Sequence, residues 1–264
     1  MSKRKTAVGI AVLFALALSA FSVASASAAN LTAVTCVTDP NGTFIGDHCL
    51  KSGSGNKAKH VEFNQDETTT GIATNANTAS ETTAARSSIL TGTLTGVPTE
   101  ITCTEVASEE GMFENRKNAK GEMYAHAEGK LHYKGCVVNK PAGKGCKVAG
   151  ETVLTNQLTG TTDIAQEAEP ALHTAEIKPK EGNIFTEIKI EKCTTEALNN
   201  TYPVTGTVKA RLSGATVQGT GAEVTAQNTL KFGGQKAGLD GAITLHAHSN
   251  AGEETHPLTI TTTS

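Results

Sequence analysis

VTGTVKARL, residues 204–212, alternates between two kinds of position with a period of two. Every second residue from 204 is apolar or small, and the residues between them are Thr, Lys or Arg. Successive side chains of a β-strand point to opposite faces, so this pattern predicts a half-buried strand. Similar alternation occurs at 131–135, 184–191, 243–247 and 258–260.

Clusters of Gly, Asn and Pro separate these stretches at short intervals, as is typical of antiparallel sheets. The sequence therefore predicts an all-β fold, an antiparallel β-sandwich or barrel-like domain with a small disulfide-bonded N-terminal β-hairpin module. The expected segments are a signal peptide at 1–28, the hairpin module at 29–66, a Thr/Ala/Asn-rich linker or edge at 67–88, and the large domain at 89–264.

The composition favours strands over a large apolar core. Residues 29–264 contain 39 threonines, whereas Leu, Ile, Val and Phe together number 43, and Trp is absent from the chain. Threonine is branched at Cβ and prefers extended backbone. We therefore expect a threonine-rich, β-rich protein with a thin core that benefits from cross-links.

The first 28 residues have the three-part layout of a secretory signal peptide. Lys3, Arg4 and Lys5 precede an apolar run at 7–23, and small residues then lead to a cleavage position after Ala28. A membrane anchor is the alternative, but the run is at the short limit for spanning a bilayer. We expect a secreted or cell-surface protein without a membrane span after cleavage.

The formal net charge of −3 becomes −6 when the three basic residues of the first 28 positions are removed. This mild acidity argues against general binding to nucleic acid or to an anionic membrane.

Residues 135–148, GCVVNKPAGKGCKV, place Cys136 and Cys146 ten positions apart around a turn-rich loop. A catalytic thiol would need an activating neighbour, and a structural zinc site usually shows closer cysteine pairs. In an exported chain, six cysteines most simply form three disulfides. The spacing favours Cys36–Cys49 and Cys136–Cys146 as hairpin staples, which leaves Cys103–Cys193, although six cysteines permit fifteen pairings.

Several landmarks resemble those of a set of exported bacterial β-rich proteins with spaced cysteines, for which no activity is established. They are Ile101-Thr-Cys103, Gly135-Cys136, Cys146-Lys-Val148, Thr155-Asn-Gln-Leu-Thr-Gly160, Cys193 and Val204-Thr-Gly206. The resemblance spans about residues 89–214. It implies an all-β secreted protein with structural disulfides and implies no activity.

One candidate site is a metal site at the C-terminus. His246 and His248 are two apart, so on a strand they share a face, and His256 is expected to return opposite His248 as a third ligand. The alternative is the ordinary polar face of a strand. These histidines define a competing hypothesis, a zinc-dependent hydrolase or metal-binding protein.

A second candidate is a run of lysines that contains no acidic residue between Glu128 and Glu151. Such a segment is suited to an anionic cell-wall polymer; alternatively, its lysines simply protect a sheet edge from aggregation. The lysines concerned are Lys130, Lys134, Lys140, Lys144 and Lys147.

The chain shows no GxSxG element, no selectable carboxylate pair and no cofactor motif. We therefore expect a secreted, disulfide-stabilised β-protein with a structural or binding role at the cell surface or outside the cell. No catalysis and no cofactor are inferred.

Overall fold

The computed structural model of the chain describes residues 30–45, 49, 51–55, 57–62, 69–75, 87–162, 174–213, 216–219, 229–248 and 255–263. In this part, every regular element is a β-strand except two 3-10 turns, η1 (Ala149–Glu151) and η2 (Glu196–Leu198). No helix there has the length and apolar character needed to cross a membrane. The expected signal peptide lies outside the described residues.

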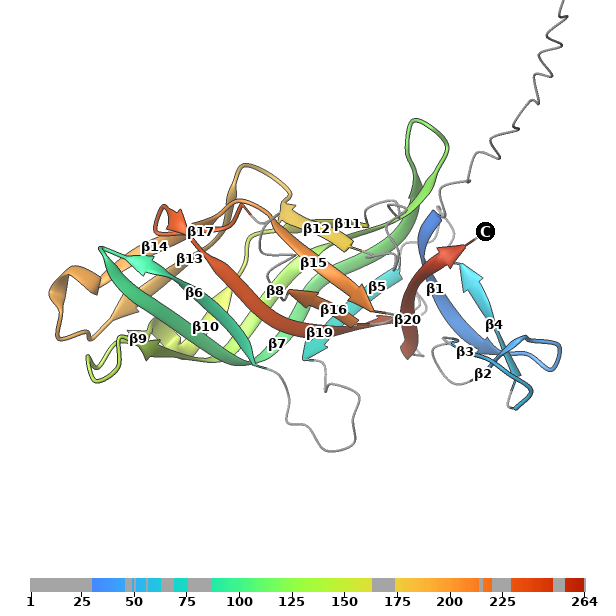
Figure 1. Ribbon diagram of the computed structural model, residues 1–264, viewed down its shortest axis with the longest axis horizontal. Coiled ribbons are helices and arrows are strands. Elements are labelled where there is room, and N and C mark those ends of the chain that lie inside the picture. Colours follow the sequence, from blue (N-terminus) through green and yellow to red (C-terminus); the bar gives the residue numbers. More distant parts are fainter. Residues whose placement is uncertain are drawn as a thin grey trace, which may run out of the picture.

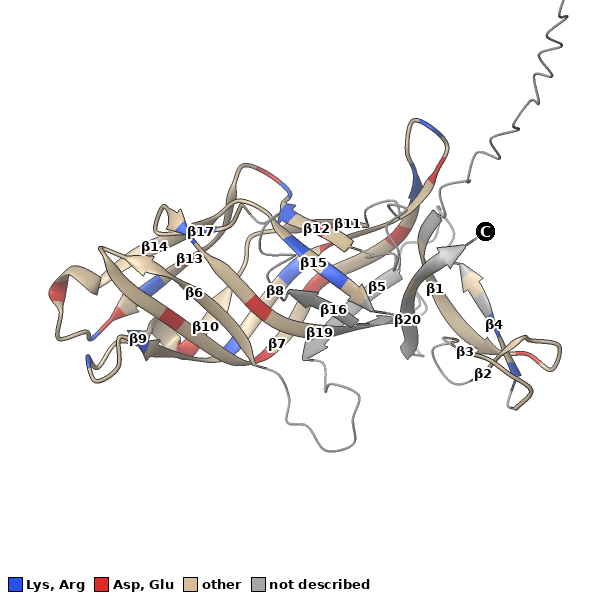
Figure 2. Cartoon of the chain, viewed as in Figure 1, with Lys and Arg blue, Asp and Glu red and all other residues tan. Residues whose placement is uncertain are grey.

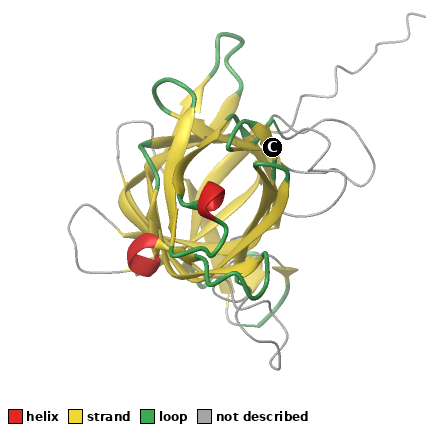
Figure 3. Cartoon of the chain, turned by 90° about the vertical axis from the view of Figure 1, so that its left-hand side faces the viewer, coloured by secondary structure: helices red, strands yellow, loops and turns green. Residues whose placement is uncertain are grey.

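The main body is a closed antiparallel sheet. In spatial order its strands are β7 (Val97–Lys117), β8 (Met123–Lys140), β11 (Leu158–Thr162), β12 (Thr174–Pro179), β15 (Val208–Ser213), β16 (Thr216–Gly219) and β19 (Gly238–His248). Two further strands, β5 (Thr69–Asn75) and β6 (Ser88–Leu94), close the ring because each pairs with β7 on one side and β19 on the other. Seen from one end, the strands surround a common axis (Figure 3).

This arrangement confirms the all-β antiparallel prediction and is the barrel-like form of the two that were expected. Residues 69–75 were expected within a linker or an edge, and the structure places them in the ring, between β7 and β19. The register of β13 (Ile184–Glu191) agrees with the predicted alternation, because Ile188 and Ile190 are 3% and 2% exposed.

Further strands extend the ring at one end. They are β9 (Lys147–Val148), β10 (Thr152–Leu154), β13, β14 (Asn200–Thr205), β17 (Lys231–Phe232) and β18 (Gln235–Lys236). β13 pairs with β9 and β14, and β14 continues to β17. In Figure 1 these strands lie on the left.

The opposite end is covered by the two terminal segments of the described chain. The strands there are β1 (Asn30–Thr38), β2 (Phe44–Ile45), β3 (Lys51–Ser52), β4 (Lys57–Glu62) and β20 (Thr255–Thr263). β1 pairs with β4 on one edge and with β20 on the other, so the N-terminal hairpin region is continuous with the C-terminal strand. Figure 1 shows this group to the right of the closed sheet.

The stretch 204–212 is two strands and not one. β14 ends at Thr205 and β15 begins at Val208, because the chain turns at Gly206, whose φ is +102°. The N–H of Gly206 donates to the carbonyl oxygen of Asn183 over 3.0 Å, and a Cβ at this position would collide with the carbonyl oxygen of Thr229. Only glycine accepts such a backbone angle and such a close approach without strain.

The three disulfides are Cys36–Cys49, Cys103–Cys136 and Cys146–Cys193. The first pairing was predicted correctly, and the other two predicted pairings, Cys136–Cys146 and Cys103–Cys193, are wrong. Cys103 lies directly opposite Cys136 in the ladder between β7 and β8, with their Cα atoms 4.0 Å apart.

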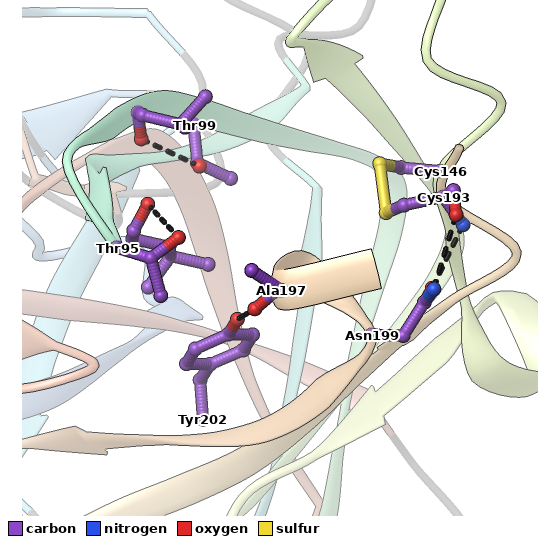
Figure 4. The surroundings of a disulfide bond; sticks show 9 residues. Thr95, Thr99, Cys146, Cys193, Ala197, Asn199 and Tyr202 are labelled. Carbon is purple, nitrogen blue, oxygen red and sulfur yellow. Dashed lines mark hydrogen bonds between the residues drawn. A yellow bond between two sulfur atoms is a disulfide. The ribbon is translucent and has the colours of Figure 1, made fainter. Parts of the chain in front are cut away.

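The loop after β8 carries Cys146 away from Cys136 and toward β13. The N–H of Thr194 donates to the carbonyl oxygen of Lys144, which brings the Cα of Cys146 within 4.1 Å of the Cα of Cys193. Asn199 holds the same corner, because its Oδ1 accepts from the N–H of Cys193 (2.8 Å) and its Nδ2 donates to the Cys193 carbonyl (3.0 Å) (Figure 4).

Buried threonines complete the backbone hydrogen bonding inside the sheet. Thr155 Oγ1 accepts from the N–H of Leu131 (2.8 Å), Thr162 Oγ1 accepts from the N–H of Ala125 (2.9 Å), and Thr186 Oγ1 donates to the carbonyl of Leu154 (2.7 Å). A buried hydroxyl without a partner is costly, whereas these hydroxyls satisfy backbone groups where a strand ends. Threonine can therefore occupy these buried positions in this chain without leaving its hydroxyl unpaired.

Candidate functional site

The interior of the closed sheet is filled at one end and hollow toward the other. At the filled end, the largest fully buried side chains pack together, and each is at most 2% exposed: Phe232, Leu94, Ile101, Ile190, Leu198 and Leu230. Toward β1 and β20 a second apolar cluster is built mainly from small residues, among them Ala33, Ala125, Ala175 and Ala210. The size of the inward side chains thus decides where space remains.

A cavity of about 100 Å³ lies in the hollow part. Its walls come from inward-facing positions of β7, β8, β11, β12, β15, β19 and β20. Its apolar surface comes from Phe113, Leu158, Leu212, Ile243 and Ile260. The space between them remains open because Ala127, Gly129 and Gly160 have small side chains or none. An apolar cavity of about 150 Å³ in another protein stays dry and binds small apolar molecules, so this lining suits an apolar guest.

Two narrower cavities of about 50 Å³ each continue the row toward the filled end. The narrow cavity next to the large one shares Leu131, Ile177 and Ile243 with it. The two narrow cavities share Ser88, Tyr133, Phe185 and Leu239. In the described part of the interior these three spaces adjoin, because neighbouring ones share lining residues.

Tyr133 lies deep in the sheet between the two narrow cavities. Burial raises the pKa of its hydroxyl to about 12, because the phenolate would lose its solvation. By accessible surface the residue is only partly buried, and it lines both narrow cavities. Its hydroxyl is neutral at physiological pH.

The outer face of β8 carries a charged network. His126 Nε2 lies 3.1 Å from Glu128 Oε1, and Lys180 Nζ lies 2.5 Å from Glu128 Oε2. The hydrogen bond from Lys180, followed by that from His126, holds the pKa of Glu128 below its usual range despite partial burial. The His126 ring is 6% exposed, and its Nδ1 has no hydrogen-bond partner within the described residues. These contacts tie the sheet to the segment before β13.

The predicted lysine run faces acidic residues that the sequence reading did not pair with it. Lys140 Nζ lies 2.7 Å from Glu100 Oε2, Lys130 Nζ lies 2.8 Å from Glu110 Oε2, and Lys134 lies opposite Glu105 in the ladder. The hydrogen bond from Lys140 lowers the pKa of the half-buried Glu100 carboxyl.

Lys144 and Lys147 are exposed and have no ion pair with any residue that the structure describes. Figure 2 shows Lys and Arg distributed among Asp and Glu over the sheet. The anionic-polymer hypothesis stays a prediction, for Lys144 and Lys147 above all.

The proposed histidine site lies on β19 and β20. The register pairs His248 with Thr255 and His256 with Ala247, so His256 does not return opposite His248 as expected. The side chains of His246, His248 and His256 lie outside the described part of the structure. Among the side chains that are described, no group of three or more His, Cys, Asp or Glu is placed to hold a metal ion.

The residues of the cavity were missed by the sequence reading. A signal was present in AHAEG, residues 125–129, where small residues occupy alternate positions of a strand. Small inward residues on several neighbouring strands leave a hollow only if those strands surround one axis, which the pattern of a single strand does not reveal.

No protein-family model, no curated protein and no solved structure matches this chain.

Proposed function

We propose that this protein is a secreted binding protein, acting at the cell surface or outside the cell, that takes up one small apolar molecule inside its closed sheet. The single observation that carries the proposal is the cavity of about 100 Å³ walled by Phe113, Leu158 and Ile260. The proposal assigns a binding role and no chemical step.

Two physical arguments support this role. A closed sheet of about eight strands either fills its interior with side chains or encloses one small ligand, and here small residues prevent complete filling. An empty apolar cavity also costs stability, about 20 cal/mol per Å² of its surface, because its lining atoms lack partners. A molecule that occupies it restores those contacts.

The disulfides support the location. Three disulfides in the described chain are typical of oxidising surroundings, such as those outside the cell. They cross-link the N-terminal hairpin region, the β7–β8 pair, and the loop next to β13.

The test is a titration with ethylbenzene, followed by calorimetry and by the melting temperature. We expect binding to raise the melting temperature, because a ligand that binds only the folded state stabilises it. No heat of binding and no rise in melting temperature at saturating ethylbenzene would contradict the proposal.

Gly160→Val supplies the cavity-blocking variant. The nearest atom to a Cβ at position 160 is the Ala127 Cβ at 3.7 Å, so a side chain fits there and enters the cavity. This variant is expected to fold and to lose ethylbenzene binding. Thr159→Val on the same strand, one residue away and facing outward opposite Glu128, is the matched control and is expected to bind like the wild type.

A further inference from the structure

Two residues with hydroxyl groups line both narrow cavities and have no hydrogen-bond partner for that group among the described residues. Tyr133 and Ser88 both line the two narrow cavities. Neither hydroxyl makes a hydrogen bond within the described part of the chain, yet neither oxygen is sealed off from accessible space. Ser88 as a residue is only 6% exposed.

The contrast with the other tyrosine of this core is informative. Tyr202 donates its hydroxyl to the carbonyl oxygen of Ala197 over 3.0 Å (Figure 4). Interior tyrosines usually find such a partner, because an unpaired buried hydroxyl costs free energy. Tyr133 has no such partner among the residues that the structure describes, so its donor is available to a molecule in the cavity.

The interior disfavours an anionic ligand. Among the described residues no Lys or Arg lines any of the three cavities, and the acidic Asp240 lines one of the two narrow ones. His126 and Glu128 border the large cavity through β8, but their side chains pair with each other on the outer face. A carboxylate in the cavity would therefore be buried without a counter-charge, which is strongly unfavourable.

We propose that the ligand is an uncharged, mainly apolar molecule with one hydrogen-bond acceptor, whose acceptor binds the hydroxyls of Tyr133 and Ser88 and whose apolar part occupies the large cavity. This inference rests on the proposed binding function. Leu131, Ile177 and Ile243, which line both the large cavity and its neighbour, would contact the middle of the molecule. The raised pKa of Tyr133 keeps its hydroxyl protonated, and hence a donor, throughout the physiological range.

The experiment compares three probes of similar shape: acetophenone, ethylbenzene and benzoate. Each of the two hydrogen bonds is expected to make acetophenone bind about two- to tenfold more tightly than ethylbenzene in calorimetric titrations. Benzoate is expected not to bind. Tyr133→Phe and Ser88→Ala should each lower acetophenone affinity by the share of one hydrogen bond and leave ethylbenzene affinity unchanged, and the double variant should bind the two probes equally.

Tyr124→Phe is the matched control, since Tyr124 lies on the same strand but lines none of the three cavities. Its affinities should equal those of the wild type. If the wild type binds acetophenone and ethylbenzene equally, or if Tyr133→Phe keeps the wild-type preference for acetophenone, the proposed hydrogen bond to the ligand is wrong. The proposed binding function would still stand. Failure of every probe to bind the wild type overturns both.

Discussion

Asn115 of β7 holds the backbone of Ala33 in β1 through two hydrogen bonds. Its Oδ1 accepts from the N–H of Ala33 over 2.8 Å, and its Nδ2 donates to the carbonyl oxygen of Ala33 over 2.9 Å. Both residues are completely buried. The side-chain amide replaces the missing neighbour strand and attaches β1 across the hollow end of the closed sheet.

Asn115→Ala should lower the free energy of unfolding by about 2–4 kcal/mol, because it leaves a buried N–H and a buried carbonyl of Ala33 without partners. Urea unfolding measures the change. Asn199→Ala removes the similar clamp on Cys193 at an exposed position, where water can replace the amide, and it should cost less. Equal costs for the two variants would show that burial of the Ala33 clamp is unimportant.

The disulfide pattern can be tested by peptide mapping under non-reducing conditions. We expect Cys103–Cys136 and Cys146–Cys193 peptides and no peptide that links Cys103 to Cys193. Replacing Cys103 and Cys136 together by Ala should cost on the order of 2–4 kcal/mol of stability. A Cys136–Cys146 peptide in protein harvested from the culture medium would contradict the register of β7 and β8.

Gly206→Ala should destabilise the fold by more than about 1 kcal/mol, since alanine is strained at positive φ and its Cβ meets the Thr229 carbonyl. Thermal unfolding is the measurement. Gly182 also has a positive φ, of +66°, but a Cβ there meets no atom within 4 Å, so Gly182→Ala isolates the backbone strain from the collision. If both variants lose the same stability, the close approach to Thr229 is not what requires glycine at 206.

The stability of the protein should fall in acid partly through Glu128. Folding lowers the pKa of this carboxyl, mainly through Lys180, so its stabilising contribution is present above the unfolded-state pKa, near 4.5. The contribution is lost as the pH falls through the lower folded-state pKa. Glu128→Gln should therefore melt at a lower temperature than the wild type at pH 7, and the difference should shrink below a pH of about 4.5.

Glu187→Gln is the control for this pH series, because Glu187 is exposed on β13 and has no ion pair with the described residues. Its melting curve should follow that of the wild type at each pH. A gap between Glu128→Gln and the wild type that stays constant from pH 7 to about pH 3 would exclude this carboxylate as a source of the acid sensitivity.

The local pattern of the sequence predicts where strands lie, but it does not predict which strands pair with one another. Ile184–Glu191 is one strand, and its Ile188 and Ile190 face inward as expected, although the register shifts between Ile184 and Thr186. VTGTVKARL alternates as well, but Gly206 breaks it, and only the contact with Thr229 from a distant segment shows why. An alternating pattern shows which side chains share a face of the sheet. It does not reveal a local turn that divides the stretch into two strands while the alternation continues.

Cysteine pairing and the cavity depend on which strands are adjacent. Cys103 and Cys136 meet because 97–117 and 123–140 form one long hairpin, whereas the ten-residue spacing of Cys136 and Cys146 favours a local staple. The alternating small residues of 125–129 enclose space only because the ring closes through β5 and β6. Both features are consequences of long-range pairing.

The most direct test of a hollow apolar interior is the diffraction of crystals pressurised with xenon, an apolar atom that enters dry cavities. We predict a bound xenon atom among Phe113, Leu158 and Ile260, and its loss in crystals of Gly160→Val. A closed sheet that contains no xenon, with side chains packed across this region, would contradict the account.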